Sequence, residues 1–328
     1  MESFEHVDAP DPQTAVELLD SPNVRPIAGG TDLLTEMKSR LVAPERLVNL
    51  KTLRELKGVD ETSDHIRIGA LTTLTELETH PLVTSRLPIL SEAASQAATL
   101  QLRNAGTVGG NLCQQVRCGY YRHPDVNCWL KGGDRCYARN GDNTHHAIFG
   151  GSGCIAVHPS DLAPALAALD AEVRILGPDG ERTEALESIY QFPEEGRRQH
   201  TTLAEDELIA EVRVPRPEST SSGTYLKAME RATWSFALVS VAVQLRWDGD
   251  RVANASAVLG AVAGTPWRVA AAEELLRGQT LDEAFAERVG EIAVANASPF
   301  SHNGYKVPLA RNLMTRALRE LAAPRSGS

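Results

Sequence analysis

The sequence predicts an α+β protein in which a larger N-terminal domain precedes a smaller C-terminal one. A segment rich in Pro, Ser and Thr at 215–222 has the composition of a linker and marks the boundary. Beyond it, three strand patterns are followed directly by three helical patterns, which is typical of a small α+β domain with an antiparallel sheet. At 328 residues the chain is long enough for two or three domains.

The N-terminal domain is predicted to begin with a short strand and a helix at 12–19 that Asp11 caps. A capping box of Thr73 and Glu76 begins a short helix, and an alanine-rich helix is predicted over 87–102. Strands are predicted at 24–28, 46–50, 66–70 and 207–214, with a hairpin around Pro178-Asp179-Gly180. The C-terminal domain has predicted strands at 223–230, 237–247 and 251–262 and helices at 267–277, 281–297 and 307–323, the second with a capping box of Thr280 and Glu283.

Two glycine pairs, Gly29-Gly30 and Gly109-Gly110, lie where helical and strand patterns meet. Glycine lets a backbone approach a ligand closely, and amides at the start of a helix favour a phosphate. Two such loops, if they converge, would enclose a pyrophosphate from both sides. The alternative for the first loop is an ordinary tight turn with a Thr or Asp cap. Neither loop has the spacing of a P-loop or of a complete dinucleotide fingerprint.

All five cysteines lie within 113–154, a segment with little periodicity. Loops of this length inside a compact domain need something to hold them together, and a metal centre would do so. An odd number of cysteines in one segment does not resemble a secreted disulfide framework.

Composition excludes several classes of function. A net charge of −10 argues against a nucleic-acid face, and we expect no membrane span. The N-terminus lacks the apolar segment of a secretory signal. We therefore expect a cytoplasmic protein, or a periplasmic one only if a signal-bearing partner exports it.

With these residues in place, the chain resembles the flavin-binding medium subunit of the molybdenum hydroxylases, a family that includes xanthine dehydrogenases, aldehyde oxidoreductases and carbon monoxide dehydrogenases. The resemblance covers nearly the whole chain. It is carried by 26–32 (PIAGGTD), 101–111 (QLRNAGTVGGN) and 159–162 (PSDL), with support from 225–227 and 236–240.

The cysteine segment narrows the resemblance. It is similar to the insert that binds a [4Fe-4S] cluster in 4-hydroxybenzoyl-CoA reductases and in three-subunit bacterial aldehyde oxidoreductases. The sequences 120–122 and 141–148 look most like the aldehyde oxidoreductase branch.

The resemblance implies a two-part FAD-binding domain of the vanillyl-alcohol-oxidase type at 1–216, with parts at about 1–57 and 58–216 and an insert at about 113–154. A C-terminal α+β domain of the carbon monoxide dehydrogenase flavoprotein type would cover 223–324. FAD would be held by Pro26, Ile27, Ala28, Gly29, Gly30, Thr31, Asp32, Thr107, Val108, Gly109, Gly110, Asn111, Ser160, Asp161 and Lys227. A [4Fe-4S] cluster would be held by Cys118, Cys128, Cys136 and Cys154.

Plainer interpretations stand beside these assignments. Four thiolates also suit structural zinc. Asp32, Ser160 and Asp161 each have an alternative role as helix caps, and Lys227 has one as an ordinary strand lysine. Trp234 is expected either to pack near the flavin or to be a buried core aromatic. Cys113 is interpreted as buried apolar filling, and His145, His146 and His158 as structural residues.

No nucleophile and base pattern is apparent, so the substrate reaction is expected on another chain. The resemblance implies a large molybdenum-cofactor subunit and a small subunit with two [2Fe-2S] clusters. This chain would accept electrons on FAD and pass them to an external acceptor. A flavin subunit of a 4-hydroxybenzoyl-CoA reductase or a xanthine dehydrogenase-like hydroxylase, a stand-alone flavin oxidase and a zinc-bound scaffold remain alternatives.

Overall fold

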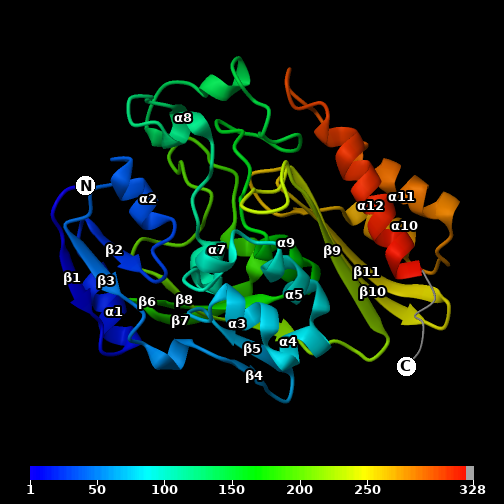
Figure 1. Cartoon of the computed structure of the whole chain (residues 1–328), viewed down its shortest axis with the longest axis horizontal. Helices are drawn as coiled ribbons and strands as arrows, with labels where there is room; N and C mark the ends of the chain where they lie inside the picture. The colour runs from blue at the N-terminus through cyan, green and yellow to red at the C-terminus, as the bar shows by residue number, and fades with distance from the viewer. Residues whose placement is uncertain (323–328) are drawn as a thin grey trace.

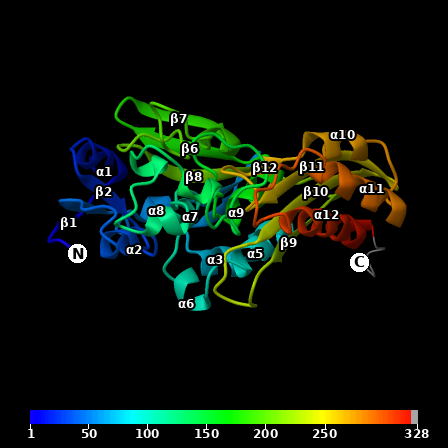
Figure 2. The same cartoon turned by 90° about the horizontal axis from the view of Figure 1, so that it is seen from above.

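The computed structural model describes residues 1–322, which form an elongated molecule of three sheets with helices packed against them (Figures 1 and 2). A small parallel sheet lies at the N-terminal end, a five-stranded antiparallel sheet in the middle, and a four-stranded antiparallel sheet at the C-terminal end. The predicted end of the last domain at 324 lies outside the described residues.

The N-terminal unit holds the first glycine loop. Its sheet has the order β1-β3-β2, from β1 (Glu5–Asp8), β2 (Val24–Ile27) and β3 (Arg46–Asn49), with α1 (Pro12–Leu19) and α2 (Leu33–Lys38). The Asp11 carboxylate accepts from the Thr14 amide at 2.8 Å, so the predicted cap of α1 is present. Because β2 ends at Ile27, the loop leaves the sheet edge and leads directly into α2.

The central unit holds the second glycine loop. Its sheet has the order β4-β5-β8-β6-β7, from β4 (Val59–Glu61), β5 (His65–Gly69), β6 (Glu172–Gly177), β7 (Gly180–Ala185) and β8 (Leu208–Pro215). Its helices are α3 (Leu74–Thr79), α4 (Pro81–Arg86), α5 (Pro88–Ser95), α6 (Leu100–Arg103), α7 (Val108–Leu112) and α9 (Leu162–Ala168). The capping box of Thr73 and Glu76 at the start of α3 is confirmed.

The alanine-rich segment 87–102 is not one helix, and that prediction is wrong. Helix α5 ends at Ser95, and α6 begins only after Thr99, whose hydroxyl accepts from the Leu102 amide. Between them Ala98 has φ of +50°, a left-handed conformation that breaks a helix. The break turns the chain toward the second glycine loop.

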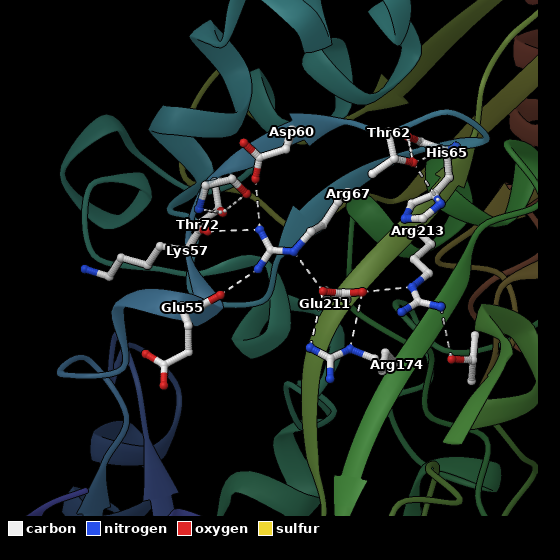
Figure 3. A network of polar contacts seen from close by, with 12 residues as sticks. Glu55, Lys57, Asp60, Thr62, His65, Arg67, Thr72, Arg174, Glu211 and Arg213 are labelled. Atoms are coloured by element: carbon white, nitrogen blue, oxygen red, sulfur yellow. Dashed lines mark hydrogen bonds and ion pairs between the residues drawn. The ribbon is translucent and has the colours of Figure 1, made fainter. Parts of the chain in front are cut away.

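One face of the central sheet carries a polar network centred on Glu211 of β8 (Figure 3). Its buried carboxylate accepts hydrogen bonds at 2.8 Å from Arg67 on β5 and from Arg213, and Arg174 on β6 contacts it as well. Burial by itself raises the pKa of Glu211, but the three guanidinium groups outweigh it and lower the pKa to about 2. The network therefore ties the three middle strands together.

The cysteine segment folds over the top of the central unit in Figure 1 with little regular structure beyond α8 (Gly119–Arg122). Contacts with the C-terminal unit hold its far end in place. Asn143 is fully buried and accepts from the His302 amide at 2.8 Å, while Asn303 donates to the carbonyls of His146 and Ala147. Ile148 and Phe149 join the C-terminal core.

The C-terminal sheet has four strands rather than the predicted three. β9 (Ser221–Ala228), β10 (Val239–Asp248) and β11 (Arg251–Gly260) are joined by the two-residue β12 (Trp267–Arg268). The helices α10 (Ala270–Leu276), α11 (Glu283–Val294) and α12 (Lys306–Ala322) follow. The predicted capping box is wrong, because Asp282 rather than Thr280 caps α11.

The largest hydrophobic core extends across the predicted linker at 215–222. It is built mostly from the central unit, with α5 and α9 at its centre, yet it includes Tyr225, Ala242 and Val258 of the C-terminal sheet. No helix within residues 1–322 is both long and apolar enough to cross a membrane.

Candidate functional site

A cavity of about 850 Å³ lies between the two glycine loops. This volume falls within the range of small-molecule sites. Twelve of the residues assigned to a flavin line it: Pro26, Ile27, Ala28, Gly29, Gly30, Thr31, Asp32, Thr107, Gly109, Gly110, Asn111 and Asp161. Val108, Ser160 and Lys227 are not among its lining residues: Val108 belongs to the core, and the other two stand behind the wall.

The two loops touch at Gly29. A Cβ atom added there would lie 2.0 Å from the carbonyl oxygen of Ala105 and 3.0 Å from the Cα of Gly106. Only glycine permits so close an approach of the two backbones. Gly30, with φ of +68°, then turns the chain into α2.

The two glycine loops differ in what their amides do. The amides from Gly29 to Leu33 have no hydrogen-bond partner among residues 1–322. By contrast, the Val108 and Gly109 amides donate to the carbonyls of Thr72 and Ala70, and those of Gly110 and Asn111 donate to Thr107. The resemblance implies that backbone amides of 26–32 and of 107–111 meet phosphate oxygens, but the amides of 108–111 are already engaged. Among the described residues, only the first loop offers a row of unused donors.

Threonine side chains in the loops also have distinct roles. The Thr107 hydroxyl caps α7 by accepting from the Gly110 amide at 3.2 Å, while the exposed Thr31 lines the cavity. A hydroxyl that accepts one hydrogen bond still has a proton to donate.

Asp32 does not cap α2, so that interpretation of its side chain is wrong. A capping side chain would accept from the amide of Leu34 or Thr35, but these amides already donate to the carbonyls of Gly30 and Asp32. The Asp32 carboxylate instead accepts from the Gln115 amide at 2.7 Å and pairs with two arginines of the insert, Arg117 at 2.9 Å and Arg122 at 3.0 Å.

Asp161, which also lines the cavity, belongs to a buried ion pair. The Asp161 carboxylate accepts from the Lys227 ammonium at 2.9 Å and from the Tyr225 hydroxyl at 2.7 Å. The Lys227 side chain has no exposed surface and also donates to the Gln96 carbonyl at 2.8 Å. Burial raises the pKa of Asp161, an effect that Lys227 opposes. Lys227 is therefore not an ordinary surface lysine, and it faces Asp161 rather than the cavity.

Ser160 does act as a helix cap, unlike Asp161. Its hydroxyl accepts from the Ala163 amide at 3.0 Å and donates to the Asn111 side chain at 2.5 Å. That second bond links the start of α9 to the second glycine loop.

Several lining residues were not assigned to the site from the sequence. Tyr190 and His200 belong to no motif and come from the region around 191–206, which has the composition of a surface loop. Phe236 lies in the segment 236–240 that supports the resemblance, but it was given no role in the site. His158 packs edge-on against Tyr190 with ring centroids 4.5 Å apart. Trp234 lines the cavity with 65% of its surface exposed, so it is not a core aromatic.

Four cysteines line a second, much smaller cavity next to α8: Cys118, Cys128, Cys136 and Cys154. Tyr121 and Leu130 line both cavities, so the two are neighbours. Cys113 stands apart: it is exposed and lines the large cavity, so the interpretation as buried filling is wrong.

Burial disfavours the thiolate form of two of these cysteines. It raises the pKa of Cys118 and raises that of Cys154 to about 12. The Nε2 atom of His146 lies 3.2 Å from the Cys118 sulfur, and burial lowers the pKa of His146 to about 4. Within residues 1–322 no three His, Cys, Asp or Glu side chains are close enough together to hold a single metal ion.

Comparison with known families identifies both parts of the chain. Residues 2–217 match the FAD binding domain in molybdopterin dehydrogenase, and residues 224–321 match the CO dehydrogenase flavoprotein C-terminal domain. The chain belongs to the FAD-binding medium subunits of the molybdenum hydroxylases. Like other members of this family, it is a flavoprotein subunit of an oxidoreductase.

Individual medium subunits of this family match nearly end to end. The chain is 36% identical over 326 residues to the aldehyde oxidoreductase FAD-binding subunit PaoB of Escherichia coli K12, covering 98% of each chain. It is 28% identical to the carbon monoxide dehydrogenase medium chain of Hydrogenophaga pseudoflava, over 89% of this chain and 87% of that one.

Solved structures of the molybdenum hydroxylases agree. Carbon monoxide dehydrogenase from Hydrogenophaga pseudoflava superposes with a TM-score of 0.77 at 27% identity, covering 97% of this chain and 96% of that chain. The predicted α+β class and the resemblance to the flavin-binding medium subunits of the molybdenum hydroxylases are confirmed.

Proposed function

We propose that this medium subunit transfers electrons within a heteromeric aldehyde oxidoreductase. A large partner would carry the molybdenum cofactor, and a small partner with [2Fe-2S] clusters would deliver electrons to FAD on this chain. An external acceptor would then remove them. The aldehyde assignment rests on the similarity to PaoB over 98% of both chains. A 4-hydroxybenzoyl-CoA reductase or a xanthine dehydrogenase-like hydroxylase is the alternative.

One observation carries the flavin site: the contact of the two glycine loops across one wall of the large cavity. The unused amides from Gly29 to Leu33 would bind the pyrophosphate, because aligned N–H groups stabilise an anion. FAD, when bound, accepts single electrons and can release two.

Among the residues that line the cavity, Asp161 is the buried acceptor that would meet a donor group of the cofactor. Its pairing with Lys227 and Tyr225 fixes the carboxylate in position. The chain's contribution is to position FAD and exclude water, since no Cys, Ser or Thr side chain among the described residues that line the cavity is hydrogen-bonded to a histidine.

We also propose that Cys118, Cys128, Cys136 and Cys154 bind a [4Fe-4S] cluster. Support comes from the donor set: four thiols from separate turns line one cavity, and iron–sulfur clusters are held by four thiolates. Binding would release protons, since burial holds the pKa of Cys154 at about 12. The cavity that these thiols line together with other side chains has a volume of about 10 Å³, so the surrounding loops would move outward around the cluster.

Zinc is the competing occupant. Zinc needs four sulfurs about 2.3 Å from one centre, which is a tighter set than these residues form. Metal analysis separates the two, because the cluster brings acid-labile sulfide and zinc does not.

The test is cofactor analysis of the complex produced with its partners. We expect bound FAD, and iron and sulfide beyond what the partner's clusters contain. Cys136→Ser should remove that surplus while FAD remains bound. Cys113→Ser is the matched control and should leave iron unchanged, since Cys113 lies outside the thiol cluster. Wild-type complex without FAD would refute the flavin proposal, and an iron content that Cys136→Ser leaves unaltered would refute the cluster.

Substrate class and location are tested separately. If aldehydes reduce the flavin, seen as a loss of its absorbance, the proposal is supported. If xanthine reduces it instead, or if electrons flow toward an aromatic acyl-CoA, the alternative is supported. We further propose that the complex works in the cytoplasm, or in the periplasm if exported with a partner, and cell fractionation would decide between these locations.

A further inference from the structure

The carboxylate of Asp32 joins the first glycine loop to the cysteine segment. Its Oδ2 accepts from the Gln115 amide at 2.7 Å, and its Oδ1 contacts Arg122 at 3.0 Å and Arg117 at 2.9 Å. With only 15% of the side chain exposed, these are shielded, charge-assisted contacts. Three groups of the insert therefore depend on one side chain of the loop.

Arg122 carries this connection to the first cysteine of the thiol cluster. Its side chain donates to the carbonyls of Val116 at 2.8 Å and Gln115 at 3.0 Å, and its amide donates to the Cys118 carbonyl at 2.9 Å. The turn that presents Cys118 is thus held by the same arginine that binds Asp32.

A second carboxylate of α2 strengthens this contact. Glu36, one helical turn after Asp32, accepts from the Tyr121 hydroxyl at 3.4 Å and lies 3.8 Å from Arg122. Burial raises the pKa of Glu36. The contacts of Glu36 are longer than those of Asp32, so Asp32 provides the main connection between the loop and the insert.

The opposite side of the same loop lines the large cavity. The unpartnered amides of Gly29 to Leu33 include that of Asp32 itself. Any displacement of the insert that moves Asp32 therefore also moves the donors that would hold a pyrophosphate.

We propose that Asp32 is a positioning residue that couples flavin binding to cluster binding. This rests on the proposed function, in which FAD occupies the large cavity and the cluster the thiol cavity. An insert ordered by its cluster holds Asp32, and hence the loop amides, in the binding geometry. Coupling is reciprocal, so bound FAD also favours retention of the cluster.

The test is a double-mutant cycle on the full chain in its complex, with Kd for FAD measured by flavin fluorescence. Cys136→Ser removes the cluster, and we expect it to weaken FAD binding about tenfold, within the usual range of coupling between sites. In the Asp32→Asn background, which is isosteric but loses the charge, Cys136→Ser should change Kd less than twofold.

Iron retention supplies a second readout that flavin affinity alone does not determine. Iron loss to a chelator should be slower in the wild-type complex with FAD than without it, and equally fast with and without FAD in Asp32→Asn. Should Asp32→Asn fail to fold, Arg117→Met removes one of the three contacts and should reduce the coupling rather than abolish it.

Glu273→Gln is the matched control. Glu273 also has 15% of its side chain exposed, accepts from a backbone amide (Ala257, 2.8 Å) and pairs with an arginine (Arg268, 3.0 Å), but it lies in the C-terminal unit. It should leave the tenfold coupling intact.

The outcomes separate this proposal from the proposed function. A wild-type complex lacking FAD, or lacking surplus iron, overturns both. A complex that holds both, with equal FAD affinity in the presence and absence of the cluster, or with coupling undiminished in Asp32→Asn, overturns the role of Asp32 alone.

Discussion

Replacing Gly29 by alanine is the most direct test of the contact between the two glycine loops. The added Cβ would lie 2.0 Å from the Ala105 carbonyl oxygen, whereas real Cβ atoms essentially never approach another heavy atom closer than 3.0 Å. The loops must therefore separate by about 1 Å. Both contacting atoms at Ala105 belong to the backbone, so no side-chain rotation can relieve the clash.

The magnitude follows from the usual cost of overpacking, about 1–3 kcal/mol. If about 2 kcal/mol of this appears as misplacement of the loop amides, Kd for FAD rises roughly thirtyfold, since 1.4 kcal/mol corresponds to a factor of ten. We expect Gly29→Ala to be purified with less FAD and to bind it more weakly in fluorescence titration. The unfolding midpoint of the flavin-free chain should fall as well.

Gly119→Ala is the control, because a Cβ at that position would meet nothing within 4 Å. It should leave FAD affinity unchanged. The reasoning would be refuted if Gly29→Ala bound FAD within twofold of wild type and had the unfolding midpoint of the wild type. The two loops would then accommodate a Cβ atom at position 29 without moving apart.

Three further changes probe buried charges. Lys227→Met leaves Asp161 unpaired and should destabilise the chain by about 3 kcal/mol in urea unfolding; the double variant with Asp161→Asn should recover much of this, and no recovery would contradict the pairing. Glu211→Gln should cost about 3 kcal/mol. Because the pKa of Glu211 is lowered from 4.5 to about 2, its stabilisation is present above pH 4.5 and is lost as the pH falls toward 2, so the variant should lose less stability on acidification than wild type. For Lys306, burial lowers the pKa from 10.5 to about 7, so the unfolded chain binds the proton more tightly. The free energy of unfolding should therefore rise between pH 7 and 10.5. Lys306→Met should abolish this dependence on pH, and an unchanged dependence would point to other groups.

The sequence predicted what depends on local residues. The Asp11 cap, the Thr73 and Glu76 box and the strand patterns are all present, because each depends on neighbours within a few positions. The break at Ala98 was not predictable from alanine content, since it is imposed by the path to the second glycine loop. Tertiary context overrides helix propensity in such places.

The location of the site was predictable from the sequence, but the different hydrogen-bonding roles of its two glycine loops were not. The two glycine pairs look alike as sequence, yet in the second loop the Val108 and Gly109 amides donate to the carbonyls of Thr72 and Ala70. These partners come from another part of the chain, so no motif encodes them. In the same way, Asp32 could be recognised as functional, but its arginine partners lie in an insert without periodicity.

The core that extends across the linker bears on how this protein can be divided. A fragment ending near residue 216 would expose the apolar surface that Tyr225, Ala242 and Val258 now cover, and would leave Asp161 with neither of its two buried donors. The flavin-binding part is therefore not expected to fold as an isolated fragment, although the composition of 215–222 is typical of a domain boundary. Calorimetry of the intact chain should accordingly record one cooperative transition in which both halves melt together.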